Sequence, residues 1–284
     1  MKFSVIITCY NEGAELLRAV RSVQDQTYTD FEIIVVKDFS AHQATLDACK
    51  QLEAEGIRVL YADTNVGVSV TRNMGIAVAK GEFTYTLDGD DELPADALAV
   101  IADAFDKYPE ADVLFGNYEL IENGISTIVD CSSVIKSGKY LRIADLISTD
   151  ILPVGQNVSR KRVAIDNPSS RSYSFGCQDF ELQLRMLEND VKFVYIPHTL
   201  YRWYKKSTGI NSSLKNAQSL DMCYYEHMPS VAPFLSHRYA LSLCKQFQDV
   251  ERYRFYFHQY APSWCRWAKY FPFPILAKFQ RFVK

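Results

Sequence analysis

The chain has 284 residues, of which 48% are hydrophobic and 23% are charged, a composition typical of a globular protein and not of a disordered one. This length allows one large α/β domain, with or without an appendage. A net charge of −3 argues against nucleic acid as a partner. The seven cysteines are scattered and include no CxxC pair, which argues against a zinc site or a disulfide framework and is typical of a reducing cytoplasm.

Met1 and Lys2 lead directly into the apolar run 3–7, which predicts a strand and not a signal peptide. No run of 18 apolar residues occurs, so we expect no membrane-spanning helix.

Apolar segments of strand length alternate with segments of helical period through the first 120 residues. Continuous apolar strands are typical of a mostly parallel sheet covered by helices on both faces. We therefore predict an α/β fold in which ligands bind outside the carboxyl ends of the strands. The predicted strands cover 3–8, 31–36, 57–62, 83–87 and 111–120, and the predicted helices cover 13–26, 41–55, 66–80 and 95–108.

This alternation is lost between about residues 124 and 197, where the pattern predicts only a helix over 179–188 and a strand over 191–196. We expect this part to complete the first domain and to form its acceptor side. The remainder of the chain has helical and aromatic patterns. The sequence thus predicts one domain over 1–213 and a helical, aromatic and basic C-terminal region over 214–284.

Three carboxylates follow the fourth predicted strand directly, at Asp88, Asp90 and Asp91. They repel one another, and a bound cation relieves this repulsion. Oxygen ligands at this density suit Mn²⁺ or Mg²⁺. Either ion typically binds one or two carboxylates and then substrate phosphates. The alternative is an acidic turn at the start of the next helix, and this segment alone does not decide between the two.

Three further segments place polar or aromatic residues at neighbouring strand ends. Asp38 follows the second strand, where it is positioned to accept a bond from a base or ribose, or simply to cap the next helix. Arg72 suits a diphosphate, although a solvated helix charge is the alternative. Tyr10 ends the first strand with a ring that either stacks on a base or packs against the protein.

Together these four segments resemble the family-2 glycosyltransferases, whose single-domain nucleotide-sugar-binding fold is called GT-A. The resemblance covers roughly residues 1–205 and is carried by SVIITCYNE, QTYTDFEIIVVKDFS, NVGVSVTRNMGIAVAKGE and LDGDD, in the family's order and spacing. Two departures concern the donor base and not the fold. Lys37 replaces the first of two acids, and Phe39 replaces the glycine that follows them.

The resemblance implies that the chain binds a nucleotide-diphosphate sugar, with a UDP-sugar favoured. It also implies a Mn²⁺ or Mg²⁺ ion held by Asp90 and Asp91, with His198 as a further ligand. A surface histidine beside Pro197 is the alternative for His198. The residues that the resemblance assigns to the nucleotide sugar are Thr8, Tyr10, Glu12, Asp38, Arg72, Asp88 and Asp90.

The family's catalytic base lies in an acidic pair at the start of a later helix. Asp179 matches the base, whereas Gln178 replaces the first acid of the pair. An acid at a helix N-terminus is also favoured by the helix dipole, which is the structural alternative. The catalytic role is favoured because an acceptor hydroxyl that attacks the anomeric carbon needs a nearby proton acceptor. Thr199 stands where processive polysaccharide synthases have Gln, which favours addition of a single sugar.

We therefore predict an inverting, metal-dependent glycosyltransferase that moves one hexosyl or N-acetylhexosaminyl group to a glycan or lipid-linked glycan. A nucleotidyltransferase would need a Gly-rich loop after the first strand, and segment 9–13 is no such loop. A catalytically impaired nucleotide-sugar-binding or scaffold protein stays as an alternative because of Lys37 and Gln178. The oligomeric state is left open.

The tail 264–284 combines aromatic residues with five positive charges, and no Asp or Glu follows Glu251. Basic aromatic segments of this kind lie on anionic membrane surfaces. Packing against the catalytic domain or a second subunit is the alternative. We expect a cytoplasmic protein whose tail reaches the inner face of the cell membrane. The aromatic residues are Trp264, Trp267, Tyr270, Phe271, Phe273, Phe279 and Phe282.

Overall fold

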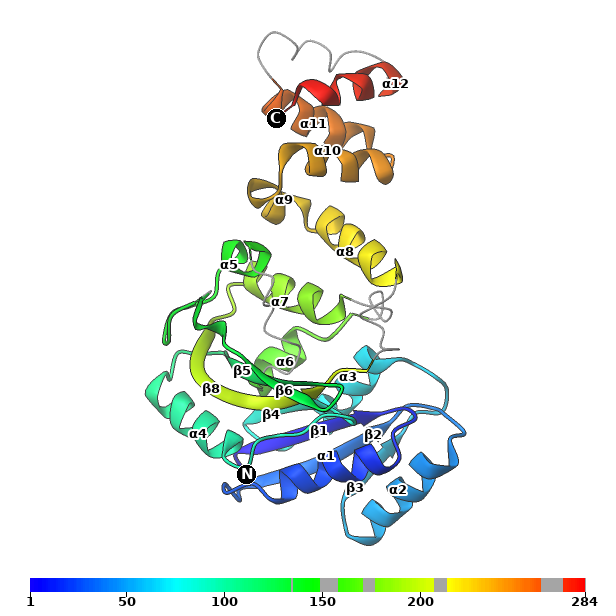
Figure 1. The fold of residues 1–284 in the computed structure, drawn as a ribbon, viewed down its shortest axis with the longest axis vertical. Coiled ribbons are helices and arrows are strands. Elements are labelled where there is room, and N and C mark those ends of the chain that lie inside the picture. The colour runs from blue at the N-terminus through cyan, green and yellow to red at the C-terminus, as the bar shows by residue number, and fades with distance from the viewer. Residues whose placement is uncertain (134, 149–157, 171–176, 207–213, 262–272, 284) are drawn as a thin grey trace. The chain divides into compact units, whose positions relative to one another are not determined.

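The computed structural model divides the chain into two compact units, Met1–Ser213 and Leu214–Lys284. Each unit has its own hydrophobic core. Figure 1 shows the course of the chain from the N-terminus to the C-terminus. The structure describes residues 1–133, 135–148, 158–170, 177–206, 214–261 and 273–283.

Strands and helices alternate through the first part of the chain, and their bounds lie within two residues of the predicted ones. The apolar spacing explains the helices: in the first helix Leu16, Val20 and Val23 recur on one face, and all three are fully buried. These elements are β1 (Phe3–Cys9), α1 (Ala14–Gln24), β2 (Phe31–Lys37), α2 (Gln43–Ala54), β3 (Arg58–Tyr61), α3 (Val68–Val78), β4 (Phe83–Asp88) and α4 (Ala97–Lys107).

The second part of this unit contains short elements that the sequence pattern did not predict, namely β6, α5, β7 and α6. The predicted strand over 191–196 extends to Tyr204, and its far half is what reaches the candidate site. These elements are β5 (Val113–Glu122), β6 (Ile125–Val129), α5 (Ile143–Ser148), β7 (Val158–Arg160), α6 (Lys161–Asp166), α7 (Gln178–Glu188) and β8 (Phe193–Tyr204), with a 3-10 turn at Cys131–Ser133.

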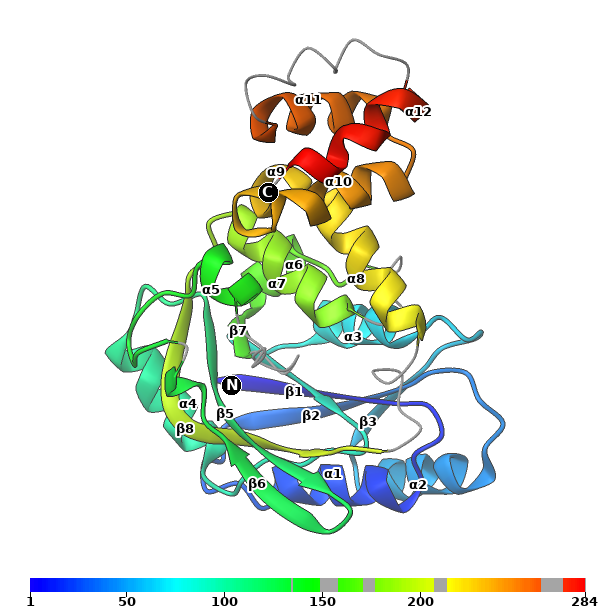
Figure 2. The same cartoon turned by 45° about the horizontal axis from the view of Figure 1, so that its top comes forward.

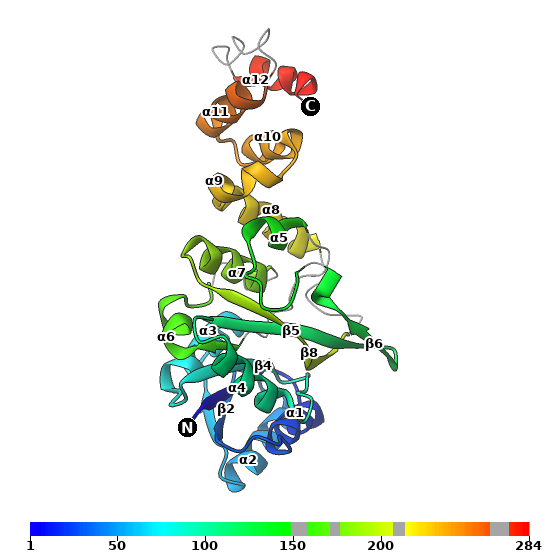
Figure 3. The same ribbon diagram turned by 90° about the vertical axis from the view of Figure 1, so that its left-hand side faces the viewer.

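Among the described residues one eight-stranded sheet has the order β3-β2-β1-β4-β7-β5-β6, with β8 paired to β5. The strands β3, β2, β1 and β4 run parallel, as predicted. The sheet as a whole is mixed, because β7 pairs antiparallel with β4 and β5, and β6 forms a hairpin with β5. β8 runs parallel beside β5 (Figure 3). The sheet is thus mostly parallel, as predicted: among the described residues four of the seven strand pairings are parallel, and the antiparallel ones all involve the short strands β6 and β7.

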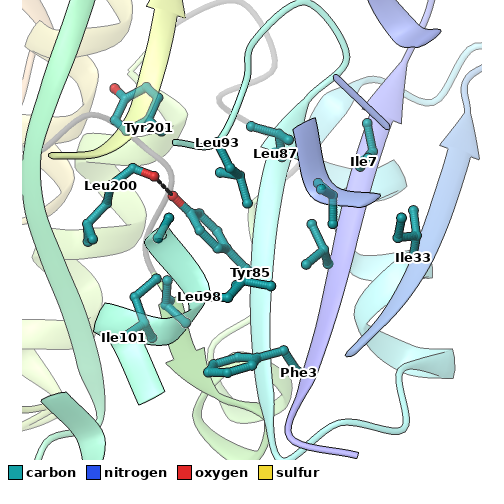
Figure 4. Packing of buried hydrophobic residues seen from close by; sticks show 14 of the residues in the cluster. Phe3, Ile7, Ile33, Tyr85, Leu87, Leu93, Leu98, Ile101, Leu200 and Tyr201 are labelled. Carbon is teal, nitrogen blue, oxygen red and sulfur yellow. Dashed lines mark hydrogen bonds between the residues drawn. The ribbon is translucent and has the colours of Figure 1, made fainter. Parts of the chain in front are cut away.

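Alternate residues of β1 face opposite layers, which is why this strand reads as one continuous apolar run. Phe3, Val5 and Ile7 belong to a core with α1, α2 and α4, whereas Ile6 belongs to a smaller one with α3 and α6. Figure 2 shows α1 and α2 on one side of the sheet and α3 on the other. The central Tyr85 is fully buried, and its hydroxyl donates to the carbonyl of Leu200 on β8 (Figure 4; 3.0 Å).

The C-terminal unit is helical, with α8 (Leu214–Glu226), α9 (Met228–Val231), α10 (His237–Gln246), α11 (Val250–Tyr260) and α12 (Phe273–Leu276), and with 3-10 turns at Ala232–Phe234 and Ala277–Phe282. Ser236 and Asp249 cap α10 and α11 through their side chains. Leu276 and Val283 are fully buried in its core. Trp264, Trp267, Tyr270 and Phe271 lie outside the described residues. No helix in the described part of the chain is long and apolar enough to cross a membrane.

Candidate active site

The polar residues predicted at successive strand ends lie at one edge of the parallel half of the sheet. Thr8 is in register with Asp88 on β4, and its hydroxyl lies 3.4 Å from Asp88 Oδ1. Gly89 makes this close approach possible, because a Cβ there would lie 2.9 Å from the carbonyl oxygen of Thr8. The sequence correctly predicted that these strand ends share an edge.

Arg72 is the centre of this site. Its Nη2 lies 2.9 Å from Asp88 Oδ1 and its Nη1 lies 2.6 Å from Asp179 Oδ1. The Arg72 side chain is 4% exposed, whereas the two carboxylates are about one-third exposed, at 35% and 31%. Burial alone would lower the pKa of Arg72, but the charges of Asp179 and Asp88 outweigh it and raise that pKa. The predicted diphosphate ligand and the predicted base are thus in direct contact.

Helix α3 positions Arg72 by lying very close to the sheet. A Cβ at Gly75, one turn after Arg72, would lie 2.3 Å from Cγ2 of Ile6, so only glycine fits at this distance. Asn73, which follows Arg72 in the same helix, makes two hydrogen bonds of 2.9 Å with the backbone of Ser169. One helix therefore fixes Arg72 and also anchors the segment that precedes α7.

Asp38 holds the loop before α3. Its carboxylate accepts hydrogen bonds from the backbone N–H groups of Phe39 (2.8 Å), Val66 (2.9 Å) and Gly67 (2.8 Å). Burial of this carboxylate is balanced by these three donors. The structure thus gives Asp38 a clear structural role, and its contact with a base or ribose stays a prediction. Lys37 is also buried, and its ammonium donates to the carbonyls of Asp38 and Ser40.

The loop after β1 is shaped by Glu12, whose carboxylate accepts hydrogen bonds from the backbone N–H groups of Tyr10 (2.5 Å) and Asn11 (3.1 Å). Tyr10 is 43% exposed, and Phe39 at the end of β2 is 55% exposed. Ser40 ties the two loops together, because its hydroxyl donates to the carbonyl of Tyr10 at 2.5 Å. Two exposed aromatic rings therefore stand on adjacent loops, where the resemblance expects the base.

Asp179 lies in the first turn of α7, where the helix dipole favours a negative charge. The residue before the helix, Cys177, has a left-handed backbone with φ 62°. Two positions along, Glu181 is buried and pairs with Arg185 at 2.8 Å. Arg185 also donates to the carbonyl of Pro168. The two acids of this turn therefore have different partners, and it is Asp179 that belongs to the site.

The acidic segment is balanced by cationic groups of the chain itself. Asp90 Oδ2 lies 2.8 Å from Lys206 Nζ, and the Asp90 carbonyl accepts from Arg18 at 2.6 Å. Asp91 is buried and accepts a hydrogen bond from the backbone N–H of Tyr204 at 2.8 Å. Burial acts to lower the pKa of Lys206, but the adjacent Asp90, followed by Glu12 and Glu15, raises it.

These carboxylates fit a divalent metal whose coordination is completed by a substrate. Within the described ranges no group of three Asp, Glu, His or Cys side chains forms a ready metal cage. The donors are nevertheless oxygens, and the Lys206 ammonium already places a cation on Asp90. Mg²⁺ and Mn²⁺ typically need only one or two carboxylates when substrate phosphates supply the other ligands. The donor set therefore suits a metal that binds together with a diphosphate.

His198 lies on β8, where its Nε2 is 3.1 Å from Asp96 Oδ2. Farther along β8, Arg202 forms an isolated bridge with Glu92, and Tyr204 reaches Asp91. The structure thus pairs His198 with an acid at the start of α4. Its role as a metal ligand stays a prediction.

The sequence pattern indicates neither the place of Lys206 nor the ion pairs behind the acidic segment. Glu92 lies 2.6 Å from Arg18 and 3.6 Å from Arg202, and the Arg18 guanidinium stacks 4.0 Å from the Tyr204 ring centroid. These contacts join three distant segments. No local spacing in the sequence indicates these contacts, since it is the pairing of β8 with β5 that brings the C-terminal end of β8 to the acidic segment.

Comparison with known proteins places this geometry in context. Residues 4–144 match the family model described as Glycosyl transferase family 2. The glycosyltransferase GlyG of Streptococcus pneumoniae is 33% identical over 117 residues, which cover 40% of this chain and 38% of GlyG. The chain therefore spans less than half the length of this relative.

Two further matches cover more of the chain. The GalNAc(5)-diNAcBac-PP-undecaprenol beta-1,3-glucosyltransferase of Campylobacter jejuni is 24% identical over 253 residues, covering 88% of this chain and 79% of that protein. The crystal structure of S. aureus TarS 1–349 in complex with UDP-GlcNAc has a TM-score of 0.67 at 20% identity, covering 91% of this chain and 80% of that one. At this identity the likeness is one of fold.

Proposed function

The chain belongs to glycosyltransferase family 2 and has the GT-A fold, and from this premise we propose that it transfers one sugar from a UDP-sugar to a glycan or lipid-linked glycan, with inversion. The TarS structure of the same fold holds UDP-GlcNAc, which supports a UDP-sugar as the donor. The name of the C. jejuni relative includes an undecaprenol-linked glycan, which supports a lipid-linked acceptor.

The observation that carries this proposal is the double ion pair of Arg72 with Asp88 and Asp179. Arg72 is 4% exposed, and its guanidinium is held at the sheet edge between two partly exposed carboxylates. Such a fixed guanidinium suits an anionic leaving group, because its donors need no reorganisation during the reaction. The Arg72 side chain therefore contacts both Asp88, which belongs to the proposed donor site, and Asp179, the proposed base.

In the proposed reaction Asp179 accepts the proton of an acceptor hydroxyl as that oxygen attacks the anomeric carbon. The bond from this carbon to the diphosphate breaks, and the diphosphate leaves with the bonding electrons. Arg72 stabilises the charge that develops on it. Asp90 and Asp91 would hold a Mn²⁺ or Mg²⁺ ion, which when bound neutralises diphosphate charge as a Lewis acid. Attack from the face opposite the leaving group gives inversion.

A panel of nucleotide sugars tests the proposal. The protein is heated with each nucleotide sugar, with Mn²⁺ and with EDTA, and free nucleoside diphosphate is measured in parallel. We expect one UDP-sugar to raise the melting temperature in Mn²⁺ and to be hydrolysed slowly. Stabilisation without any hydrolysis or transfer would instead support the catalytically impaired binding protein. No stabilisation by any nucleotide sugar would contradict both.

The basic aromatic tail is proposed as a contact with the membrane surface that carries the acceptor. Its composition supports this, with five positive charges in 264–284 and no acid. Part of the tail serves the C-terminal unit, because Leu276 and Val283 are buried in its core and the Val283 carbonyl accepts from Arg238 at 2.7 Å. The membrane proposal therefore concerns mainly 264–271, which lies outside the described residues.

A further inference from the structure

Lys206 places a positive charge where a metal-dependent enzyme would place its metal. Its Nζ lies 2.8 Å from Asp90 Oδ2, and the two side chains are 47% and 26% exposed. A divalent metal held by Asp90 would compete with the Lys206 ammonium for this carboxylate. An ammonium and a divalent ion on one carboxylate oxygen repel each other, so the binding of either one to Asp90 weakens the binding of the other.

The neighbouring acids leave Asp90 as the carboxylate on which this exchange takes place. Asp88 is bound to the buried Arg72, which also binds Asp179 and is thereby held on two sides. Asp91 is 2% exposed and accepts a hydrogen bond from the backbone N–H of Tyr204 at 2.8 Å. Lys206, by contrast, is on a long, half-exposed side chain that can turn away without disturbing the core.

We infer that Lys206 is the internal counter-ion of the metal-free enzyme, and that a divalent metal displaces its ammonium from Asp90 when it binds. This inference rests on the proposed metal-dependent function and adds a residue that competes with the metal. The consequence is that Mn²⁺ alone binds weakly, because it must first break the Lys206–Asp90 ion pair.

The adjacent residue provides a matched control. Lys205 pairs with Glu122 at 3.0 Å, and its side chain is 44% exposed, close to that of Lys206. Lys205→Met therefore removes the same charge and a comparable ion pair one residue away, but not from the acidic segment. Lys206→Arg keeps the cation, and Lys206→Gln serves as a second neutral variant.

The experiment measures the affinity of Mn²⁺ alone for the full chain, by calorimetry or by electron paramagnetic resonance of free Mn²⁺, with melting temperatures as the check of folding. We expect Lys206→Met and Lys206→Gln to bind Mn²⁺ about 2- to 5-fold more tightly than the wild type, which corresponds to the loss of one partly exposed ion pair. Lys205→Met and Lys206→Arg should match the wild type.

Repeating the titration with UDP separates this inference from the proposed function. If the wild type binds Mn²⁺ with UDP, but Lys206→Met and Lys206→Gln bind Mn²⁺ alone no more tightly than Lys205→Met, the inference is overturned and the metal-dependent function stands. If none of the proteins binds Mn²⁺, with or without UDP, both are overturned. Binding of Mn²⁺ alone by the neutral Lys206 variants and not by the wild type would support the inference most strongly.

Discussion

Arg72 Nη1 lies 2.6 Å from Asp179 Oδ1, a contact between residues that are 107 positions apart in the sequence. It joins α3, which follows the loops proposed to bind the nucleotide, to the first turn of α7. The same guanidinium contacts Asp88 at 2.9 Å. A change at any of these three residues is therefore expected to affect the other two.

Asp179→Asn is expected to lower turnover by about 10²–10⁴-fold, the usual range for loss of a general base. The amide keeps the side-chain shape and an oxygen that still accepts from Arg72, so donor affinity should change little. Turnover, donor affinity and melting temperature are measured on the same preparation. A nearly wild-type rate would reject the assignment of Asp179 as the base.

Glu181→Gln is the control for that variant. Glu181 lies in the same helical turn, but it is buried and paired with Arg185. We expect it to lower the melting temperature with little effect on turnover. An equal loss of turnover in both variants would indicate that the start of α7 matters structurally and not as a base.

Arg72→Lys is expected to weaken donor binding and to destabilise the protein by about 1.5–3 kcal/mol, the range for hydrogen bonds to charged groups. Lysine keeps the charge but lacks the planar fork that contacts Asp88 and Asp179 together. Donor affinity and urea unfolding measure the two effects. Arg21→Lys, at the exposed pair with Glu55, is the control and should change neither.

Gly75→Ala is expected to destabilise the protein by about 1–3 kcal/mol through overpacking against Ile6 and Val36. It should also reduce donor affinity, because α3 must move away from the sheet and carries Arg72 with it. Ala77→Ser, at an exposed position of the same helix, is the control. Unchanged donor affinity in a folded Gly75→Ala protein would show that Arg72 tolerates the shift.

EDTA is expected to abolish turnover, and Mn²⁺ should restore it. Asp90→Asn should weaken binding of Mn²⁺ with UDP, because it removes one of the two carboxylates proposed to hold the metal. His198→Ala distinguishes the two roles of His198. If His198 is a metal ligand, the variant should bind Mn²⁺ more weakly than the wild type, whereas if His198 only pairs with Asp96, the Mn²⁺ affinity should be unchanged. Full activity in excess chelator would contradict the metal prediction.

Membrane binding is best tested by charge reversal, because deletion of 262–284 would remove Leu276 and Val283 from the core of the C-terminal unit. Arg266→Glu with Lys269→Glu should release the protein from anionic vesicles while leaving donor hydrolysis intact. Lys50→Glu with Lys107→Glu makes the same change in net charge at exposed positions of the first unit. Unchanged co-sedimentation of the tail variant would favour packing.

The parallel half of the fold was predictable because its signals are local. Continuous apolar runs at β1, β2 and β4 identify buried strands, and the helical period of α1 places its buried face. The sequence also placed Thr8 and Asp88 at one edge of the sheet, since parallel strands end together. It did not predict β7, which has three residues and is stabilised by its neighbours in the sheet.

The partners of the site residues could not be predicted, because they depend on packing between distant segments. Nothing near Asp38 in the sequence indicates that Val66 and Gly67 would donate to its carboxylate. Lys206 likewise meets Asp90 only because β8 extends to the acidic segment. The type of a side chain and its place at a strand end suggest which ligand it could bind. The groups of the protein that the same side chain already contacts are known only from the three-dimensional structure.

The division of labour along the chain has a consequence for protein engineering. The residues proposed for the donor lie between Thr8 and Asp91, whereas the proposed base is supplied by the later stretch 158–192 that contains α6 and α7. Recombination of that later stretch with its counterpart in a relative would exchange the proposed base while retaining the residues proposed for the donor. Such a chimera would have to keep the contacts that join the two parts, among them the hydrogen bonds between Asn73 and Ser169 and the ion pair between Arg72 and Asp179.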